Sequence, residues 1–132
     1  MFTFTLETNS KNEMVDITPL VKQAVRDSKI EEGLCCVFVP HTTAGVIINE
    51  NADRDVKADI IGALSRLVPA SGDYRHMEGN SDAHIKSCLV GNSITVPVEG
   101  GVPALGTWQG IYFCEFDGPR KRKVLIKIIK SV

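Results

Sequence analysis

The sequence predicts one α+β domain that is rich in β-sheet, with mixed or antiparallel sheets and about three packed helices. Its 132 residues are 43% hydrophobic, which is enough apolar material for a single core. Segments with the two-residue period of strands dominate, and a few segments have the helical period. No internal repeat, linker or low-complexity stretch divides residues 1–132, so we expect a single domain.

The first predicted elements are a strand and a helix. Apolar and polar residues alternate over residues 2–6, which predicts a half-buried strand, and residues 9–13 predict the turn that ends it. Thr18 can then cap a helix in which Pro19 takes the first position. The helix carries an apolar stripe made of Leu20, Val21, Ala24 and Val25.

Two further strands and a helix follow. Residues 34–39 form a continuous apolar run between Gly33 and Pro40, which predicts a strand covered on both faces. Residues 45–48 predict the next strand, and Asp53 can cap the helix after it. The apolar positions of that helix are Val56, Ile60, Leu64 and Leu67.

The second half of the chain predicts a short helix and three strands. The helix covers residues 82–89, and a strand covers residues 93–98. Residues 107–115 and 121–130 are expected to pair as a hairpin about a turn at residues 117–119. In the last strand one face is expected to carry Lys123, Leu125 and Lys127, and the other Val124, Ile126 and Ile128.

Composition and cysteine usage predict a cytoplasmic protein. Charged residues make up 23% of the chain and the net charge is −1, which disfavours a disordered tail or a general polyanion binder. The four cysteines lie in or beside apolar segments without a CxxC pair, so we expect buried, reduced thiols. The N-terminus lacks a signal-peptide pattern and no apolar run reaches the roughly 18 to 20 residues of a membrane span. We expect neither a membrane nor a nucleic-acid partner.

All three histidines of the chain are candidate metal ligands. His41 follows a predicted strand, His76 lies with Glu78 in the irregular loop of residues 70–80, and His84 opens the third predicted helix. Neutral imidazoles and one carboxylate form a usual catalytic site for zinc, iron or manganese. The alternative is that one histidine caps a helix, one is hydrogen-bonded in the core and one is exposed.

Three carboxylates are candidate catalytic groups. Glu50 follows an apolar strand and can serve as a general base or bind a hard cation, whereas Asp53 and Asp55 are assigned to helix capping. Glu78 and Asp82 are neighbours of His76 and His84 in the sequence. We therefore expect Glu50, Glu78 and Asp82 to carry catalytic roles.

Two other segments are candidate anion-binding sites. The glycines at 100–101 precede Thr107 and Gln109, and such glycines let backbone amides approach an oxyanion, although the composition favours a plain turn. Trp108 between the two polar residues is expected to anchor the core. The basic run at residues 120–123 is expected to be a solvated turn, from which Arg120 can reach an anionic substrate.

Five motifs together resemble the YjbQ-like family, also described as secondary thiamine-phosphate synthase enzymes. The resemblance covers nearly the whole chain. The motifs are HTTAG at 41–45, NENAD at 49–53, YRHMEGNSDAHIK at 74–86, LGTWQG at 105–110 and CEFDGPR at 114–120. Two positions depart from the family pattern: Arg54 stands where proline is frequent, and Val102 weakens a phosphate role for the glycine loop.

The resemblance implies a homotrimer with its polar motifs near subunit boundaries, and it supports His41, His76 and His84 as ligands of a divalent metal. The implied activity joins an aminopyrimidine diphosphate to a thiazole phosphate and releases pyrophosphate, a reaction that needs a divalent cation and positive groups. Arg75, Lys86 and Arg120 are the expected positive groups.

Three nitrogen ligands would select a zinc-like ion over magnesium, so thiamine-phosphate synthesis is expected to be a side activity. The expected function is thus a metal-dependent enzyme acting on a small anionic or phosphorylated molecule. The alternatives are a non-catalytic trimeric module that binds a small ligand or metal, and a structural trimer knitted together by its histidines.

Overall fold

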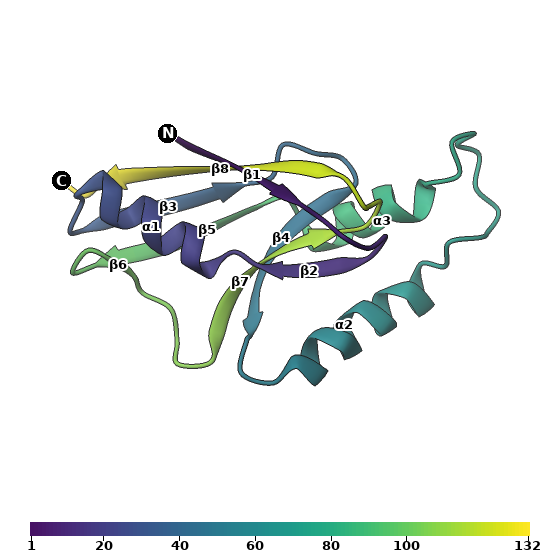
Figure 1. The fold of residues 1–132 in the computed structure, drawn as a ribbon, viewed down its shortest axis with the longest axis horizontal. Helices are drawn as coiled ribbons and strands as arrows, with labels where there is room; N and C mark the ends of the chain where they lie inside the picture. The colour runs from purple at the N-terminus through teal and green to yellow at the C-terminus, as the bar shows by residue number, and fades with distance from the viewer.

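Two antiparallel sheets and three helices build the chain, and the computed structural model describes all of residues 1–132 (Figure 1). The larger sheet has the strand order β1-β8-β3-β5-β6 and the smaller has the order β2-β7-β4. In chain order the elements are β1 (Phe2–Glu7), β2 (Glu13–Asp16), α1 (Thr18–Ser28), β3 (Gly33–Phe38), β4 (Ala44–Glu50), α2 (Arg54–Leu67), α3 (Ser81–Val90), β5 (Ser93–Glu99), β6 (Val102–Pro103), β7 (Gln109–Glu115) and β8 (Lys121–Lys130). The predicted β-rich α+β fold with three helices is confirmed.

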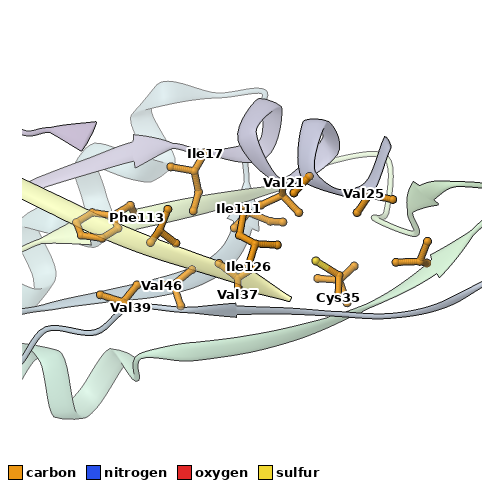
Figure 2. Close-up of a cluster of buried hydrophobic side chains, with 14 of the residues drawn as sticks. Ile17, Val21, Val25, Cys35, Val37, Val39, Val46, Ile111, Phe113 and Ile126 are labelled. Atoms are coloured by element: carbon orange, nitrogen blue, oxygen red, sulfur yellow. The ribbon is translucent and has the colours of Figure 1, made fainter. Parts of the chain in front are cut away.

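The main core lies between the two sheets and α1. Val21, Ala24 and Val25 of α1 are fully buried, at the spacing of one helical face. Figure 2 shows Val21 and Val25 pointing from the helix toward the strands, where Cys35 and Ile126 lie. Each fully buried aliphatic side chain of this kind contributes about 1.5–3 kcal/mol. The predicted apolar stripe of α1 is therefore what fixes this helix against the strands.

The start of α1 differs from the prediction. Thr18 is the first helical residue, with Ile17 at the N-cap position, and the carboxylate of Asp16 accepts hydrogen bonds from the backbone N–H and the hydroxyl of Thr18. The hydroxyl oxygen of Thr18 in turn accepts the backbone N–H of Ile111 on β7, at 2.9 Å. Thr18 therefore does not cap the helix; it joins the helix to the smaller sheet.

One face of the larger sheet is open. Leu34 and Phe38 on β3 are 50% and 40% exposed, while Cys35 and Val37 between them are fully buried. The prediction that this strand is covered on both faces is wrong. Its neighbours β5 and β8 both run antiparallel to it, and an antiparallel sheet can leave one face uncovered.

The predicted hairpin between the last two long strands is also wrong. β7 pairs with β2 and β4, whereas β8 pairs with β1 and β3, so the two strands belong to different sheets. Residues 116–120 carry the chain from one sheet to the other. The predicted faces of β8 are nevertheless correct, because Val124 and Ile126 are buried and Lys123 and Lys127 are exposed.

Helix α2 packs more loosely than its sequence predicts. Asp53 caps it as predicted, accepting the N–H of Asp55 at 2.8 Å. None of its residues is fully buried, and Leu67 is 74% exposed. Ile60 and Leu64 cover a small second core on the three-stranded sheet. None of the three helices has both the length and the apolar content needed to cross a membrane.

The cysteines are all free, but they differ in exposure. Burial raises the pKa of Cys35 to about 11, with a contribution from Cys36, and raises the pKa of Cys114 to about 12. Cys88 on α3 is exposed and Cys36 is half-buried, so the expectation of buried thiols holds only for Cys35 and Cys114.

Candidate functional site

A polar pocket of about 480 Å³ contains all three histidines. It lies where the β3–β4, α2–α3 and β7–β8 loops meet the first turns of α3 and the start of β8. No hydrophobic residue lines it. The lining residues are Pro40, His41, Thr42, Thr43, His76, Glu78, Asn80, His84, Asp117, Arg120 and Arg122.

His41 is held by the edge of β8. Strand β3 ends at Phe38, opposite Leu125, and Pro40 just beyond it has no N–H to continue the ladder. The backbone N–H of Lys123 donates instead to Nε2 of His41, at 2.9 Å. This bond requires the lone pair of Nε2, so it selects the neutral ring with its proton on Nδ1. Burial, with the nearby Arg122 guanidinium, lowers the pKa of His41, which favours the same neutral form.

His84 owes its position to the close packing of α3 on β4. A Cβ atom on Gly45 would lie 2.5 Å from the carbonyl oxygen of Gly91, so only glycine lets the strand approach the helix end this closely. The hydroxyl of Ser87 donates to the carbonyl of Ala44 at 2.7 Å, which fixes the helix further. The His84 side chain is thereby brought to the mouth of the β3–β4 loop that carries His41.

His76 lies beside His84 on the α2–α3 loop. The two rings meet edge to face, with centroids 5.4 Å apart and an interplanar angle of 88°. Nε2 of His76 is 3.9 Å from Oε2 of Glu78, and both side chains are well exposed. The loop predicted to be functional therefore does form one wall of the pocket.

Asp117 ties two of the pocket loops together. Its carboxylate oxygen Oδ2 accepts Nδ2–H of Asn80 at 2.9 Å and Nη2–H of Arg120 at 3.1 Å. Nε–H of Arg120 also donates to the backbone carbonyl of Asp117 at 2.9 Å. The amide oxygen of Asn80, Oδ1, is buried without a protein partner. Arg120 remains 49% exposed, so it is oriented by Asp117 yet still open to a ligand.

Arg122 forms the floor of the pocket through a buried ion pair. Its side chain is 3% exposed and that of Glu115 is fully buried. Nε–H donates to Oε1 of Glu115 at 2.9 Å, and Nη2–H donates to Oε2 of Glu115 and, at 2.8 Å, to Oγ1 of Thr43. The pair connects the end of β7 to the start of β8 and to the loop after His41.

Glu115 is held ionised by its hydrogen bonds. Burial alone would raise the pKa of this carboxyl, but the guanidinium of Arg122, the hydroxyl of Thr8 at 2.7 Å and the N–H of Asp117 at 3.0 Å outweigh burial and lower the pKa. The N–H of Phe116 also donates, at 3.1 Å. Both carboxylate oxygens of Glu115 thus accept hydrogen bonds.

The histidines and carboxylates of the pocket are residue types that bind metal ions, but their side chains are not positioned around a common point. No group of three or more histidine, cysteine, aspartate or glutamate side chains is positioned to hold an ion. Nε2 of His41 is occupied by a backbone N–H, and the His76 and His84 rings face each other edge to face. The pocket therefore presents no preformed site for a metal ion.

Two predicted site residues lie outside the pocket in a buried polar cluster. Asp82 is fully buried and accepts Nζ–H of Lys11 at 2.7 Å, with Nζ of Lys86 at 4.0 Å. Lys86 is 2% exposed and donates to Asn12 at 3.1 Å. Burial lowers the pKa of Lys86, and Asp82 opposes this shift. Lys86 is therefore not available as a positive group for a ligand, and Asp82 serves the packing of α3.

Three further predicted residues lie at the other end of β4 and β7. Glu50 is the last residue of β4 and pairs with Gln109, the first residue of β7, with Thr107 just before it. His41 precedes the first residue of β4, so about 20 Å of strand separates Glu50 from the histidines. The structure does not bring Glu50, Thr107 or Gln109 to the pocket. Trp108 is 64% exposed, so its predicted role as a core anchor is wrong.

The basic run and the glycine loop also differ from expectation. The structure buries Arg122 in the middle of a run predicted to be a solvated turn. The two-residue period of β8 was the signal that could have identified it, since Arg122 shares the parity of Val124 and Ile126. Gly100 and Gly101 form a turn between β5 and β6 with φ angles of 58° and 77°, as the plain-turn alternative expects.

Comparisons with known proteins agree on one family. The profile described as UPF0047 protein YjbQ-like matches residues 2–131. A UPF0047 protein of Methanocaldococcus jannaschii is 55% identical over 129 residues, covering 98% of this chain and 94% of the relative. The UPF0047 protein YugU of Bacillus subtilis is 49% identical over 128 residues, covering 96% of this chain and 97% of the relative.

Crystal structures of relatives share the whole fold. A YjbQ/UPF0047 protein from Clostridium acetobutylicum matches with a TM-score of 0.96 and 54% identity, covering 98% of this chain and 100% of that one. A protein from Sulfolobus solfataricus, described as YbjQ-like and of unknown function, matches with a TM-score of 0.95 and 33% identity, covering 98% and 96%. The chain therefore belongs to the YjbQ-like UPF0047 family.

Proposed function

We propose that the histidine pocket is the active site of an enzyme that acts on a small phosphorylated molecule. The observation that carries this proposal is the composition of the pocket wall, which joins three imidazoles to two guanidinium groups without one hydrophobic residue. Guanidinium groups match the geometry of phosphate oxygens, and imidazoles transfer protons near neutral pH. A ligand that fills such a pocket is polar over its whole surface.

Recognition is assigned to Arg120 and its neighbours. Asp117 holds the Arg120 side chain by two hydrogen bonds, which lowers the entropy that the side chain loses when it binds a ligand. The side chain is 49% exposed, so its remaining N–H groups can reach a phosphate oxygen. Thr42 adds a hydroxyl to the lining of the pocket.

Proton transfer is assigned to the histidines. His41 is neutral and presents Nδ1–H, because Nε2 accepts the Lys123 amide. It therefore acts as a hydrogen-bond donor toward an oxyanion. His76 is exposed and His84 is half-buried, as His41 is, and Glu78, at 3.9 Å from His76, can orient a protonated His76 ring. In this assignment His76 and His84 exchange protons with the substrate, and His41 orients it.

The specific reaction we propose to test first is thiamine-phosphate synthesis, the activity attached to the family resemblance. The thiazole nitrogen would attack the methylene carbon of the aminopyrimidine diphosphate, and the carbon–oxygen bond would break with its electron pair leaving on pyrophosphate. Arg120 lies in the pocket to receive that anion, whereas Lys86 is buried elsewhere. No hydrophobic residue lines the pocket to pack against the pyrimidine ring, which supports a side activity.

Measurements of reaction rate test the proposed enzymatic activity. Release of pyrophosphate and hydrolysis of simple phosphate esters would be measured for the native chain, for His76→Ala with His84→Ala, and for Lys127→Gln as a surface control. We expect the double histidine variant to lose at least tenfold in rate while the control keeps the native rate. Equal rates in all three proteins would remove the enzyme proposal. A ligand that binds and is recovered unaltered would support the alternative, a binding module.

We also propose that the chain assembles as a homotrimer. The open face of the larger sheet exposes Leu34, Phe38 and Ile129, and α3 exposes Ile85 and Leu89. Apolar side chains grouped on one sheet face mark contact surfaces in many proteins. Sedimentation equilibrium would give three times the chain mass of 14.4 kDa if the proposal holds, and the chain mass alone if it does not.

A further inference from the structure

The longest connection of the chain, between α2 and α3, contains a segment that is not hydrogen-bonded to the rest of the protein. The hydrogen bonds within residues 69–79 are internal: the hydroxyl of Tyr74 donates to the carbonyl of Pro69 at 2.6 Å, and the N–H of Gly79 donates to the carbonyl of His76 at 3.4 Å. Tyr74 is half-buried and all the other residues of the segment are exposed. Segments with so few contacts to the core move at a low cost in free energy.

Both ends of segment 69–79 are fixed. Val68, just before it, is buried. Asn80, just after it, donates its Nδ2–H to the carboxylate of Asp117 at 2.9 Å. Gly79 lies next to this fixed residue with a φ angle of 76°, and an added Cβ there would have no atom within 4 Å. A glycine with this freedom beside an anchored residue suits a hinge.

The segment also has room to move. A hollow of about 520 Å³ lies between it and α3, lined by Asp73, Tyr74, Arg75, His76, Ser81, His84 and Ile85. His76 and His84 line the histidine pocket as well, so an unfilled space adjoins the segment on each side of these rings. Figure 1 shows the connection extending away from both sheets. Movement of the segment therefore displaces no packed side chain of the core.

Two buried acceptors lie where the segment joins α3. Oδ1 of Asn80 and Oδ1 of Asp82 are the buried side-chain atoms of the chain that lack a hydrogen-bond partner. A buried acceptor without a donor is unfavourable. The backbone N–H groups of residues 70–78 donate to no acceptor in the protein. The observed arrangement thus leaves hydrogen-bonding capacity unused on both sides of Gly79.

We propose that segment 69–79 is a lid, which is open in the free protein and closes over the histidine pocket when an anion binds there. His76 and Glu78 form the pocket side of the lid, and the ring N–H of His76 is the group drawn toward the anion. Closure excludes water, which strengthens the attraction between Arg120 and the anion. This inference rests on the proposed function, because it takes the closing ligand to be the phosphorylated molecule bound beside Arg120.

Amide hydrogen exchange measured by NMR tests the lid, with and without inorganic phosphate, in buffer containing a chelator. The probes are the amides of residues 71–75. These residues do not line the histidine pocket, so direct contact with the bound anion would not protect them. The reference is the amide of Ala52, an exposed residue outside the pocket whose N–H also lacks a hydrogen bond. Arg120→Met is the variant with weakened phosphate binding.

In the free chain we expect the probe amides to exchange within about tenfold of the rate of an unstructured peptide. Phosphate that saturates the histidine ring signals of the native chain is expected to slow this exchange at least tenfold, with Ala52 unchanged and no slowing in Arg120→Met at the same concentration.

Three results would overturn the lid: probe amides already protected without phosphate, the same slowing in Arg120→Met, or unchanged exchange while the histidine signals of the native chain shift and saturate. The last result would leave the proposed function standing, because the anion would still bind in the pocket. If the native chain bound no phosphate, both the lid and the proposed function would fall.

Discussion

Arg122 and Glu115 form an ion pair across the junction of the two sheets, seven residues apart in sequence and on strands that do not pair with each other. The pair holds the end of β7, the start of β8 and Thr43 of the loop after His41. Glu115 also accepts a hydrogen bond from the hydroxyl of Thr8, the residue after β1. One buried charge pair thus fixes three of the segments from which the pocket is built.

Removing one partner of this pair is expected to destabilise the fold strongly. In Glu115→Gln the guanidinium of Arg122 stays buried without its counter-charge, which costs about 3–5 kcal/mol in comparable cases. Urea unfolding would measure the loss in free energy of unfolding. Glu7→Gln, an exposed residue on β1, is the matched control and is expected to change stability by less than about 0.5 kcal/mol. Similar values for both variants would contradict the role of the pair.

His41 is expected to make the fold less stable as the pH falls. Its pKa in the folded chain lies below the ordinary value of 6.5, so the unfolded chain binds the proton more readily. The contribution of His41 is fully present above pH 6.5 and is lost as the pH falls through the folded pKa. Unfolding free energies measured from pH 8 to pH 5 should therefore fall less for His41→Gln than for the native chain. Parallel pH curves would contradict the neutral, amide-bonded state of His41.

Glu115 adds to the loss of stability at lower pH. Its pKa is lowered below 4.5, so its contribution is present above that value and is lost as the pH falls through the folded pKa. The two groups act in separate windows, so a pH series extended to well below pH 4.5 distinguishes them.

Two glycine-to-alanine substitutions should act in opposite directions. At Gly45 an added Cβ lies 2.5 Å from the Gly91 carbonyl, so Gly45→Ala forces α3 away from β4 and lowers stability by about 1–3 kcal/mol. At Gly62, inside α2, the added Cβ meets only the flexible end of Arg66 at 3.4 Å. Gly62→Ala is expected to raise stability by about 0.5–1 kcal/mol. Thermal unfolding of the two variants measures both effects, and equal signs would contradict the packing of α3 on β4.

Metal binding remains a prediction. If the histidines bind a zinc-like ion, equilibrium dialysis should find one zinc per chain in the native protein and none in His76→Ala with His84→Ala. Cys88→Ser is the control, because its thiol lies near His84 in an adjoining hollow and is a competing donor. Zinc retained by the histidine variant but lost from Cys88→Ser would contradict the predicted ligand set.

The sequence predicts single elements well because each depends on local periodicity and capping. The stripe of α1, the Asp53 cap and the two faces of β8 follow from spacing alone. The pairing of strands does not, since β7 and β8 show the same alternation whether they form a hairpin or enter different sheets. Periodicity therefore identifies both strands but not the strands with which they pair.

The sequence likewise identifies some residues of the candidate site and not others. His41, His76 and His84 were singled out as polar residues near element ends, and the fold brings them to one pocket. Glu50 has the same sequence signature, yet it is the last residue of β4 whereas His41 precedes that strand, so the two lie at opposite ends of it. Arg122 was hidden in a run of basic residues. Which end of a strand a residue occupies in space depends on topology, which periodicity alone does not give.

The most direct measurement is a titration of the native chain with inorganic phosphate, in chelator-containing buffer, followed by the NMR signals of the three histidine rings. We expect the signals of His41, His76 and His84 to shift together and to saturate with one dissociation constant, and we expect binding at least tenfold weaker in Arg120→Met. Ring signals that stay unchanged, or an Arg120→Met titration that matches the native one, would contradict it.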